Sequence, residues 1–369
     1  MTIGVTSLFM CGDVMTGRGI DQILPHPGNP ELREAYVKDA RRYVELAQAK
    51  NGAFPLPVDL RWPWGDALAL IDERAPDVRL INVETSITRS GDFWPRKAVN
   101  YRMSPANIGC ITAVRPDAVA LANNHVLDFG YAGLEETLKS LAASGLAAAG
   151  AGSSDAEAQR PVTVQIRAGA RVLLFSCGMP TSGIPLTWGA TAEQAGVNLI
   201  RNTSAASADT VAGNVARFKQ AGDIAVVSIH WGSNWGYEVA EDQILFARRL
   251  IDGGVDLIHG HSSHHPRPIE VYRGKLILYG CGDFIDDYEG ISGHESFPDV
   301  RVAYFASIDT ATGALIDLEL VPMTAHKMSL ITASPADQAT LRDLLASCSA
   351  DFGTTFELSQ IDPPVLRIA

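Results

Sequence analysis

The stretch Leu8-Phe9-Met10-Cys11-Gly12-Asp13-Val14 shows a pattern that recurs along this chain, an apolar run that ends in polar residues. A short apolar run of this kind predicts a buried β-strand, and the absence of basic residues before it argues against a secretory signal. Similar runs predict strands near Val78–Val83, Ala118–Ala122, Val172–Ser176, Ile224–His230, Leu257–His259, Leu276–Tyr279, Val302–Asp309 and Leu315–Val321.

Helical patterns alternate with these strands. They lie near Trp64–Glu73, Gly133–Ser144, Asp209–Gln220, Asp242–Asp252 and Pro335–Ser347. Such alternation predicts βαβ crossovers and a mostly parallel, buried sheet. The last two strands are joined by Thr310-Ala311-Thr312-Gly313, which is typical of a hairpin. We therefore expect a mixed sheet.

Two segments look like insertions. Residues 25–63 are rich in proline at both ends and carry a charged helix predicted near Glu31–Lys50, and residues 179–204 are rich in glycine, threonine and proline. Both follow predicted strands, and loops at the carboxyl ends of strands build ligand sites in α/β sheets. We interpret them as a cap segment and a pocket loop, with solvated surface decoration as the open alternative.

Charge and cysteine content exclude several classes of function. The 30 basic and 42 acidic residues give a net charge of −12, which argues against nucleic acid or a membrane surface as partner, because both require clustered Lys and Arg. No apolar run reaches the ~18 residues of a membrane helix. The five cysteines form no CxxC pair, so we expect neither a disulfide framework nor a structural zinc site. We place the protein in the cytoplasm.

Six polar clusters follow the predicted strands. They are Gly12-Asp13, Asn82-Val83-Glu84, Asn123-Asn124-His125, His230-Trp231-Gly232, the run His259–His265 and the run Asp283–Asp287. Each alone is typical of a turn or a structural hydrogen bond. Together they bring carboxylate, carboxamide and imidazole groups to one sheet edge, and such a set suits a divalent metal. We predict one or two ions and leave Mn, Zn, Mg, Ca and Fe open.

These motifs, with the stretch from Gly260-His261 to Pro268-Ile269-Glu270-Val271-Tyr272, resemble the CapA family of poly-γ-glutamate capsule synthesis proteins. That family belongs to the calcineurin-like metallophosphatase superfamily. The resemblance covers roughly residues 8–325. It implies an α/β fold, a four-layer αββα sandwich of mixed sheets, formed as a single domain over residues 1–369 with the metal site at one sheet edge.

The resemblance also implies a set of metal ligands. They are Asp13, Glu84, Asn124, His230 and His261, with His259 or His264 competing for the last position. His125, beside Asn124, matches an acid or hydrogen-bond donor of the family. Two positions depart from the superfamily pattern, which has His where this chain has Met15 and a bridging Asp where it has Glu84. These changes remove one ligand of the first metal and put a two-metal hydrolytic centre in doubt.

Three functions stay open. The region after Gly260 resembles a subgroup that includes the lasso-peptide epimerase, so our first hypothesis is metal-assisted epimerisation at the α-carbon of a peptide substrate. Its acid and base candidates are His294, His125 and Asp13. The second is a hydrolase for phosphoesters or γ-glutamyl amides, and the third is a non-enzymatic role in polymer synthesis or export.

Four residues near these motifs are candidates for substrate binding. They are Arg18, Trp231, His264 and Asp283. Arg18 follows the first motif and could contact a substrate carboxylate, while Trp231 could line a groove for an extended peptide, although core packing is the alternative for such a tryptophan. The oligomeric state is left open.

Overall fold

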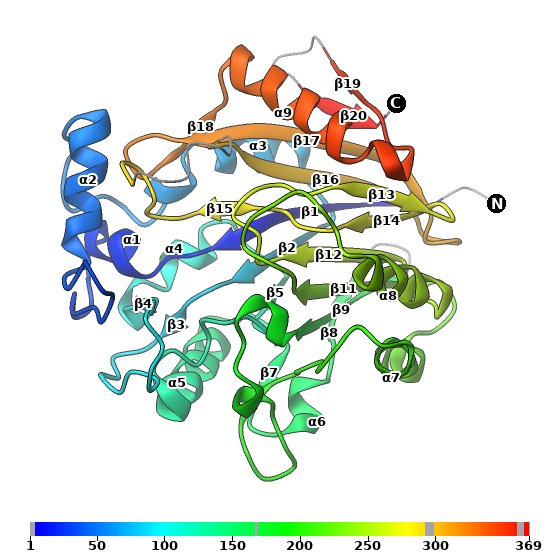
Figure 1. The fold of residues 1–369 in the computed structure, drawn as a ribbon, viewed down its shortest axis with the longest axis horizontal. Helices are drawn as coiled ribbons and strands as arrows, with labels where there is room; N and C mark the ends of the chain where they lie inside the picture. The colour runs from blue at the N-terminus through cyan, green and yellow to red at the C-terminus, as the bar shows by residue number, and fades with distance from the viewer. Residues whose placement is uncertain (1–3, 167–168, 292–298, 360–364, 369) are drawn as a thin grey trace.

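Two mixed sheets pack face to face in the computed structural model, which describes residues 4–166, 169–291, 299–359 and 365–368 (Figure 1). Within these residues the larger sheet has ten strands. Its order is β19 (Phe356–Leu358), β20 (Leu366–Ile368), β17 (Leu315–Ala325), β16 (Arg301–Asp309), β1 (Val5–Val14), β2 (Val78–Val83), β5 (Ala118–Ala120) and β6 (Ala148–Ala149), with β15 (Asp283–Ile285) beside β1 and β18 (Leu330–Thr332) beside β17.

The second sheet has six strands within the same described ranges. Its order is β13 (Ile269–Tyr272), β14 (Lys275–Leu278), β12 (Leu257–His261), β11 (Ile224–His230), β9 (Arg171–Gly178) and β8 (Val162–Gln165). Two small ribbons pair β3 (Ser86–Ile87) with β4 (Arg102–Met103) and β7 (Ala151–Gly152) with β10 (Gly196–Val197).

Helices flank both sheets. The α-helices are α1 (Arg18–Ile23), α2 (Arg41–Asn51), α3 (Asp66–Arg74), α4 (Gly109–Thr112), α5 (Gly130–Ala143), α6 (Asp155–Ala158), α7 (Ala205–Phe218), α8 (Glu241–Asp252) and α9 (Pro335–Cys348). Short 3-10 helices are η1 (Trp62–Trp64), η2 (Pro105–Asn107), η4 (Pro180–Ser182), η5 (Leu186–Trp188) and η6 (Ala350–Phe352).

The alternation of side chains along β1 explains the layers. Leu8 and Met10 belong to the core between the sheets, which also contains apolar residues of β11 and β12. Phe9 and Cys11 belong to the core on the opposite face, shared with α3 and α5, because successive side chains of a strand point to opposite sides. A third core packs α7 and α8 on the outer face of the six-stranded sheet. The four-layer α/β sandwich is therefore confirmed.

The strand registers bring the polar strand ends together. β1 is parallel to β2 and β15, which aligns Asp13 with Asn82 and with Asp283. β11 is parallel to β12, which aligns His230 with His261. The carboxyl ends of these strands thus meet at one edge.

A close approach of the backbone at Gly12 fixes the end of β1. A Cβ at this position would lie 1.7 Å from the carbonyl oxygen of Gly282, so only glycine fits. The approach allows the amide of Asp13 to donate to that same carbonyl at 2.9 Å. It therefore anchors Asp13, a candidate metal ligand.

Most predicted elements are confirmed with shifted ends, including the hairpin between β16 and β17. The charged helix predicted near Glu31–Lys50 is wrong in its first part. The structure begins α2 at Arg41, and before it Glu31 pairs with Asp39 in an isolated β-bridge. The roles of residues 25–63 as a cap and 179–204 as a pocket loop stay predictions.

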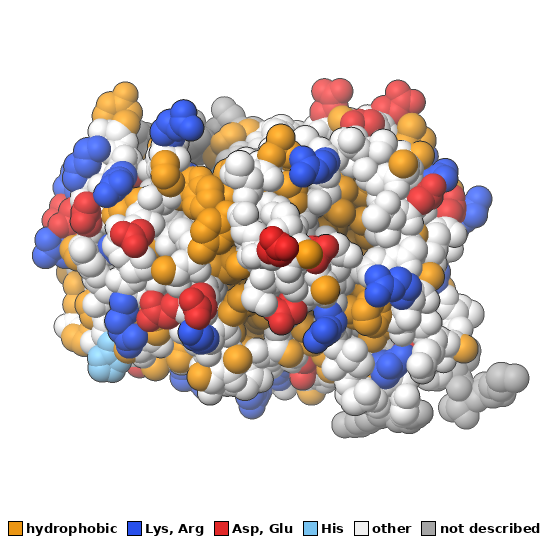
Figure 2. Space-filling view, turned by 90° about the horizontal axis from the view of Figure 1, so that it is seen from below, with side chains coloured by type: hydrophobic (Ala, Val, Ile, Leu, Met, Phe, Trp, Pro, Cys, Tyr) orange, Lys and Arg blue, Asp and Glu red, His pale blue; other side chains and the backbone are white. Residues whose placement is uncertain are grey.

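Charges on the described surface are mixed. Figure 2 shows one face on which basic and acidic side chains are interspersed, with no patch of a single sign across the described atoms in that view. In the described part of the chain, no helix is both long and apolar enough to cross a membrane.

Candidate metal centre

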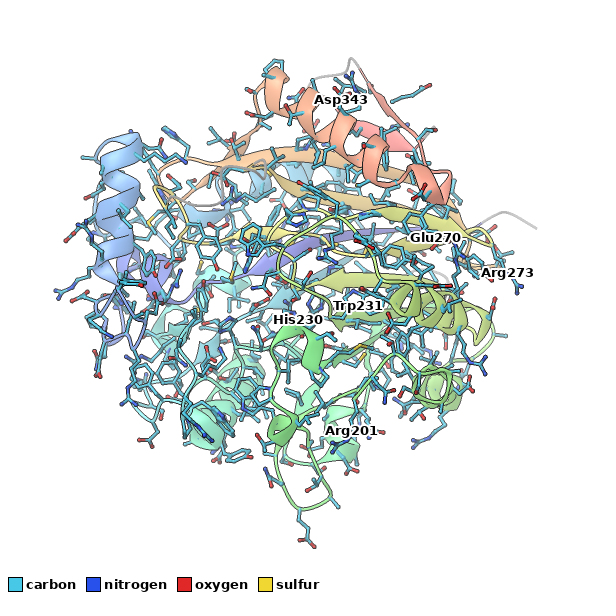
Figure 3. All side chains as sticks on the ribbon, viewed as in Figure 1. Arg201, His230, Trp231, Glu270, Arg273 and Asp343 are labelled. Carbon is cyan, nitrogen blue, oxygen red and sulfur yellow. The ribbon has the colours of Figure 1, made fainter. Side chains whose placement is uncertain are left out.

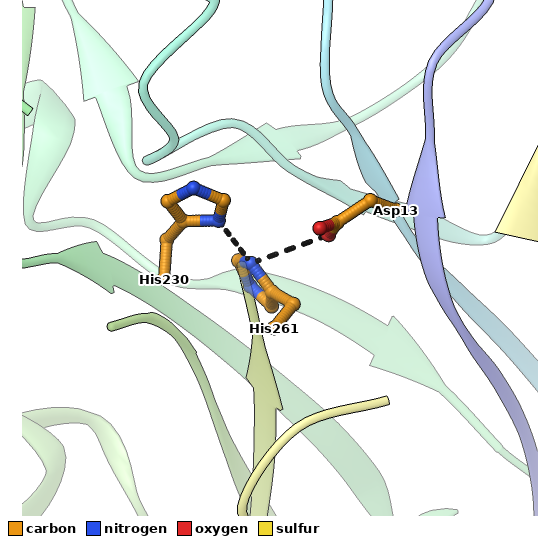
Figure 4. A group of neighbouring side chains, drawn as sticks. All are labelled: Asp13, His230 and His261. Carbon is orange, nitrogen blue, oxygen red and sulfur yellow. Dashed lines mark hydrogen bonds and ion pairs between the residues drawn. The ribbon is translucent and has the colours of Figure 1, made fainter. Parts of the chain in front are cut away.

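Three side chains from distant parts of the sequence converge at the sheet edge (Figure 4). Asp13 is the penultimate residue of β1, while His230 ends β11 and His261 ends β12. The ligand atoms of the three residues lie within 4.8 Å of one another. The Nδ1 atoms of the two histidines are 2.7 Å apart, and Nδ1 of His261 lies 3.7 Å from Oδ1 of Asp13. All three residues are fully buried.

Two further predicted ligands lie against His230, next to this cluster. Oδ1 of Asn124 lies 3.1 Å from Nε2 of His230. Oε2 of Glu84 lies 3.8 Å from Nδ1 of the same histidine. The structure therefore brings together five of the predicted donors, and two imidazoles with three oxygen-bearing side chains suit a divalent cation.

The two carboxylates are held by one amide. Nδ2 of Asn82 donates to Oδ1 of Asp13 at 2.7 Å and to Oε2 of Glu84 at 3.1 Å. The backbone amide of Ser262 donates to Oδ2 of Asp13 at 3.2 Å. These bonds orient both acids toward the histidines.

The electrostatics of the pair favour a cation. Burial, together with the charge of Asp283, raises the pKa of Asp13 to about 7. Burial and the neighbouring Asp13 raise the pKa of Glu84 well above its usual range. Two buried acids that resist ionisation together become compatible when a positive ion lies between them. The donor set therefore fits a divalent metal.

The histidines provide neutral nitrogen donors. Burial, reinforced by neighbouring imidazoles, lowers the pKa of His230 and of His261 well below the usual value. An uncharged imidazole keeps the lone pair that a metal ligand needs.

His259 does not join the cluster, contrary to the expectation that it could ligate. Its Nε2 lies 2.8 Å from the carbonyl oxygen of Cys11, and its Nδ1 lies 3.1 Å from Oγ of Ser228. Both ring nitrogens are thus engaged. The Ser228 hydroxyl also lies 2.8 Å from Nε2 of His261. Ser228 therefore connects His259 to the candidate ligand His261, and His259 supports that ligand indirectly.

The Ser228→Ala variant tests this support. We expect about a tenfold loss of metal affinity, because groups that hold the second nitrogen of a ligating histidine typically contribute 10- to 100-fold. Competition with a fluorescent chelator measures the affinity. Ser140→Ala on α5 is the matched control, since its hydroxyl only bonds its own helix at the carbonyl of Glu136. Equal affinities for the Ser228→Ala and wild-type proteins would contradict this role.

His125 lies at the edge of the cluster. Its Nε2 is 3.8 Å from Oε1 of Glu84, and its Nδ1 is 2.6 Å from Oδ2 of Asp128, the natural acceptor for an Nδ1 proton. Nζ of Lys97 lies 2.7 Å from Oδ1 of Asp128. Burial and the Lys97 charge lower the pKa of His125 to about 4. His125 is therefore a neutral base candidate.

His264 lies on the same pocket and has a different partner. Its Nδ1 lies 2.9 Å and 3.1 Å from the two carboxylate oxygens of Asp283. Burial lowers the pKa of His264, but the Asp283 charge and hydrogen bond outweigh it and raise the pKa above the usual value. A pocket of about 250 Å³ is lined by both His125 and His264, together with Glu84 and Asn124.

Met15 occupies the position at which the superfamily pattern has a metal-binding histidine. Its side chain is buried, and its sulfur lies 3.9 Å from the hydroxyl of Tyr288, which also lines the pocket. That hydroxyl is 2.7 Å from the hydroxyl of Tyr101. An apolar thioether thus stands beside the cluster.

Arg18 does not suit the substrate contact that was expected of it. The residue is 4% exposed. Its guanidinium bonds Asp287 and, at 2.8 Å, Oε1 of Glu34, and it lies 3.9 Å from the ring centre of Tyr43 and 4.4 Å from that of Tyr101. It therefore ties the chain between β15 and β16 to the segment around α2.

Of the remaining candidates for substrate binding and catalysis, two are buried beside the centre and one lies outside the described residues. Trp231 is 2% exposed and donates to the carbonyl oxygen of Tyr279 at 3.0 Å, so it packs beside the centre and offers no open face to this pocket. Asp283 is buried and positions His264. His294 lies outside the described residues.

Sequence reasoning missed several residues that support the centre. Asn82 lies on β2 two positions before Glu84, which directly follows that strand, and this spacing was an available signal. Ser228 has the same relation to His230 on β11. Lys97 lies in a loop, and the sequence marked it only as a basic residue near the site, without its role beside Asp128.

The fold and this cluster define a four-layer α/β protein with a buried candidate centre for a divalent cation. The family model described as "Bacterial capsule synthesis protein PGA_cap" matches residues 7–288. The chain therefore belongs to the PGA_cap family of bacterial capsule synthesis proteins, and its recognition as a CapA-type sequence is confirmed.

The chain is 52% identical over 351 residues to a probable polyglutamine synthesis accessory protein of Mycobacterium tuberculosis, covering 95% of this chain and 92% of the relative. It is 28% identical to the PGA biosynthesis protein CapA of Bacillus subtilis, covering 69% and 63%. A crystal structure described as a novel phosphatase of Mycoplasma pneumoniae aligns at 12% identity with a TM-score of 0.48, covering 92% and 98%.

Proposed function

We propose that this protein is a metal-dependent hydrolase that cleaves amide bonds in a glutamate-containing polymer or peptide. The observation that carries the proposal is the convergence of Asp13, His230 and His261 beside a pocket lined by two further histidines. The names of the relatives, which refer to polyglutamine synthesis and PGA biosynthesis, support a substrate built from glutamate or its amide, glutamine.

Asp13, Glu84, Asn124, His230 and His261 would hold the cation. A bound divalent cation supplies Lewis acidity, which polarises a carbonyl and makes water a stronger nucleophile near neutral pH. The protein supplies the proton transfers. His125, oriented by Asp128, would accept a proton at Nε2. His264, held at Nδ1 by Asp283 and with Nε2 at 3.0 Å from Nδ2 of Asn234, is the candidate donor of a proton to the leaving amine.

An amine-release assay tests the hydrolase proposal. Poly-γ-glutamate, α-linked polyglutamate and γ-glutamyl peptides are incubated with protein loaded separately with Mn²⁺, Zn²⁺, Mg²⁺, Ca²⁺ or Fe²⁺. We expect new primary amine from at least one substrate, loss on chelation, and recovery when the cation returns. A phosphoester is included because the fold also supports phosphoester hydrolysis. Absence of amine release with every cation would count against the proposal.

Epimerisation of a peptide α-carbon is the second candidate. It is favoured by one observation, that two histidines with different carboxylate partners, His125 and His264, line the same pocket. Epimerisation needs one base and one acid at the same carbon. Deuterium uptake from D₂O at a single Cα, without release of amine, would distinguish it from hydrolysis.

A non-enzymatic accessory role is the outcome that both assays must exclude. Asp13→Ala and His230→Ala remove two candidate ligands. If polymer formation in cells is unchanged by both variants, the centre is not needed for the function and the accessory role is favoured.

A further inference from the structure

A second pocket of about 350 Å³ lies beside the candidate metal centre. The loop after β11 separates the two pockets, since Ser233 lines the second pocket and Asn234 lines the first. Figure 3 labels His230 and Trp231 at the end of β11, and Trp231 borders the second pocket. This pocket shares none of its lining residues with the first.

The inner wall of the pocket carries a buried arginine. Arg267 is 3% exposed, and its Nη2 donates to the carbonyl oxygen and hydroxyl of Ser233 at 2.9 Å and 2.7 Å. Its Nε has no hydrogen-bond partner, and none of the ion pairs between described residues involves Arg267. A buried guanidinium without an acidic partner is costly and leaves room for an external anion.

A second unpartnered polar group lies beside this arginine. Gln243 is 6% exposed and its Nε2 also has no hydrogen-bond partner. A Cβ on Gly232 would lie 3.4 Å from Nη1 of Arg267 and 3.5 Å from Oε1 of Gln243, so both groups approach the same spot. Ala240 and Gln243 bring the N-terminal end of α8 to the wall, where the helix dipole also favours an anion.

The mouth of the pocket is acidic. Glu238 is exposed and lines the pocket, as does Asp242. Asp242 accepts hydrogen bonds from the hydroxyl of Thr203 and from the backbone amide of Gln243, so its two oxygens are engaged. The pocket therefore presents cationic and amide groups at Arg267 and Gln243 and carboxylates at Glu238 and Asp242, which suits a ligand that carries charges of both signs.

We propose that this second pocket binds an α-amino-acid group, with the α-carboxylate against Arg267 and Gln243 and the α-ammonium toward Glu238. A free amino acid has this arrangement of charges, and so does the amino-terminal residue of a γ-linked glutamyl chain. The proposal is independent of the reaction at the metal centre, because no candidate ligand lines this pocket.

Calorimetric titration with L-glutamate, D-glutamate and N-acetyl-L-glutamate tests the site on the full-length protein. We expect wild-type protein to bind at least one glutamate enantiomer. Arg267→Gln and Gln243→Leu are expected to weaken that binding about tenfold or more. Glu238→Gln is expected to weaken binding of the free amino acid while leaving the weaker binding of the N-acetylated probe unchanged.

Two controls keep the result interpretable. Circular dichroism and thermal unfolding check that each variant is folded, and the exposed Glu238→Gln tests the site if the buried Arg267→Gln variant fails to fold. Asp13→Asn is expected to lose metal but to bind glutamate as the wild type does, which separates this site from the proposed hydrolase. Absence of binding of either enantiomer to the wild-type protein, or unchanged affinity in folded Gln243→Leu and Glu238→Gln variants, would overturn the proposal.

Discussion

The His230→Ala variant is expected to lose metal affinity by about 100-fold or more and to lose amide hydrolysis with it. His230 is the link between the donors, since its Nδ1 lies 2.7 Å from His261 and its Nε2 lies 3.1 Å from Asn124. Removing the His230 imidazole deletes a neutral nitrogen donor that lies beside the Asp13 and Glu84 carboxylates. Metal analysis of the purified protein, followed by titration against a competing chelator, measures the loss.

His326→Ala is the matched control for this experiment. His326 is exposed in the turn between β17 and β18, so the same chemical change is made where no candidate ligand lies. We expect its metal content and activity to equal those of the wild type. Equal metal affinity in the His230→Ala and His326→Ala proteins would show that the cluster in Figure 4 is not the binding site.

The strands and the cluster of polar side chains at their ends could be predicted because their signals are local, whereas the four layers were implied by the resemblance to the CapA family. An apolar run followed by Asp13 or His230 marks a buried strand and its polar end, and parallel strands place such ends at one edge. Predicting this convergence did not require knowing which strands are neighbours. It required only that the strands run parallel, so that their carboxyl ends lie at the same edge of the sheet. The register pairs Asp13 with Asn82 and His230 with His261 because of this arrangement.

The choice between His259 and His261 could not be made from the sequence. The two stand two positions apart on β12, so their side chains point to the same face, and the motif spacing favoured His261 without excluding His259. The difference comes from β1 of the other sheet, whose Cys11 carbonyl lies 2.8 Å from Nε2 of His259. A contact between residues 248 positions apart leaves no local trace.

Arg18 is a second residue whose environment depends on contacts that are distant in the sequence. The short segment Gly17-Arg18-Gly19 is typical of a surface turn, yet Arg18 is buried with a positive φ of 46°. Its partners, Glu34 and Asp287, lie 16 and 269 residues away. Long-range charge pairing therefore decided the role of a residue whose local sequence indicated exposure.

The Arg18→Met variant is expected to lower the free energy of unfolding by about 3–5 kcal/mol, because it leaves two buried carboxylates without their cation. The side chains of Arg18 and Asp287 are 3% and 0% exposed, and that of Glu34 is 11% exposed. Equilibrium unfolding in urea measures the loss. Because methionine keeps the length of the aliphatic side chain, the change removes charge more than volume.

Arg41→Met is the control that distinguishes a buried pair from an exposed one. Arg41 also pairs with an aspartate, Asp39, but its side chain is 66% exposed, so we expect its replacement to leave the free energy of unfolding nearly unchanged. Adding Asp287→Asn to Arg18→Met is expected to recover part of the stability, since an amide is less costly to bury than an unpaired carboxylate. If Arg18→Met costs no more than Arg41→Met, the buried network around Arg18 does not hold the segment of α2 against the chain that follows β15.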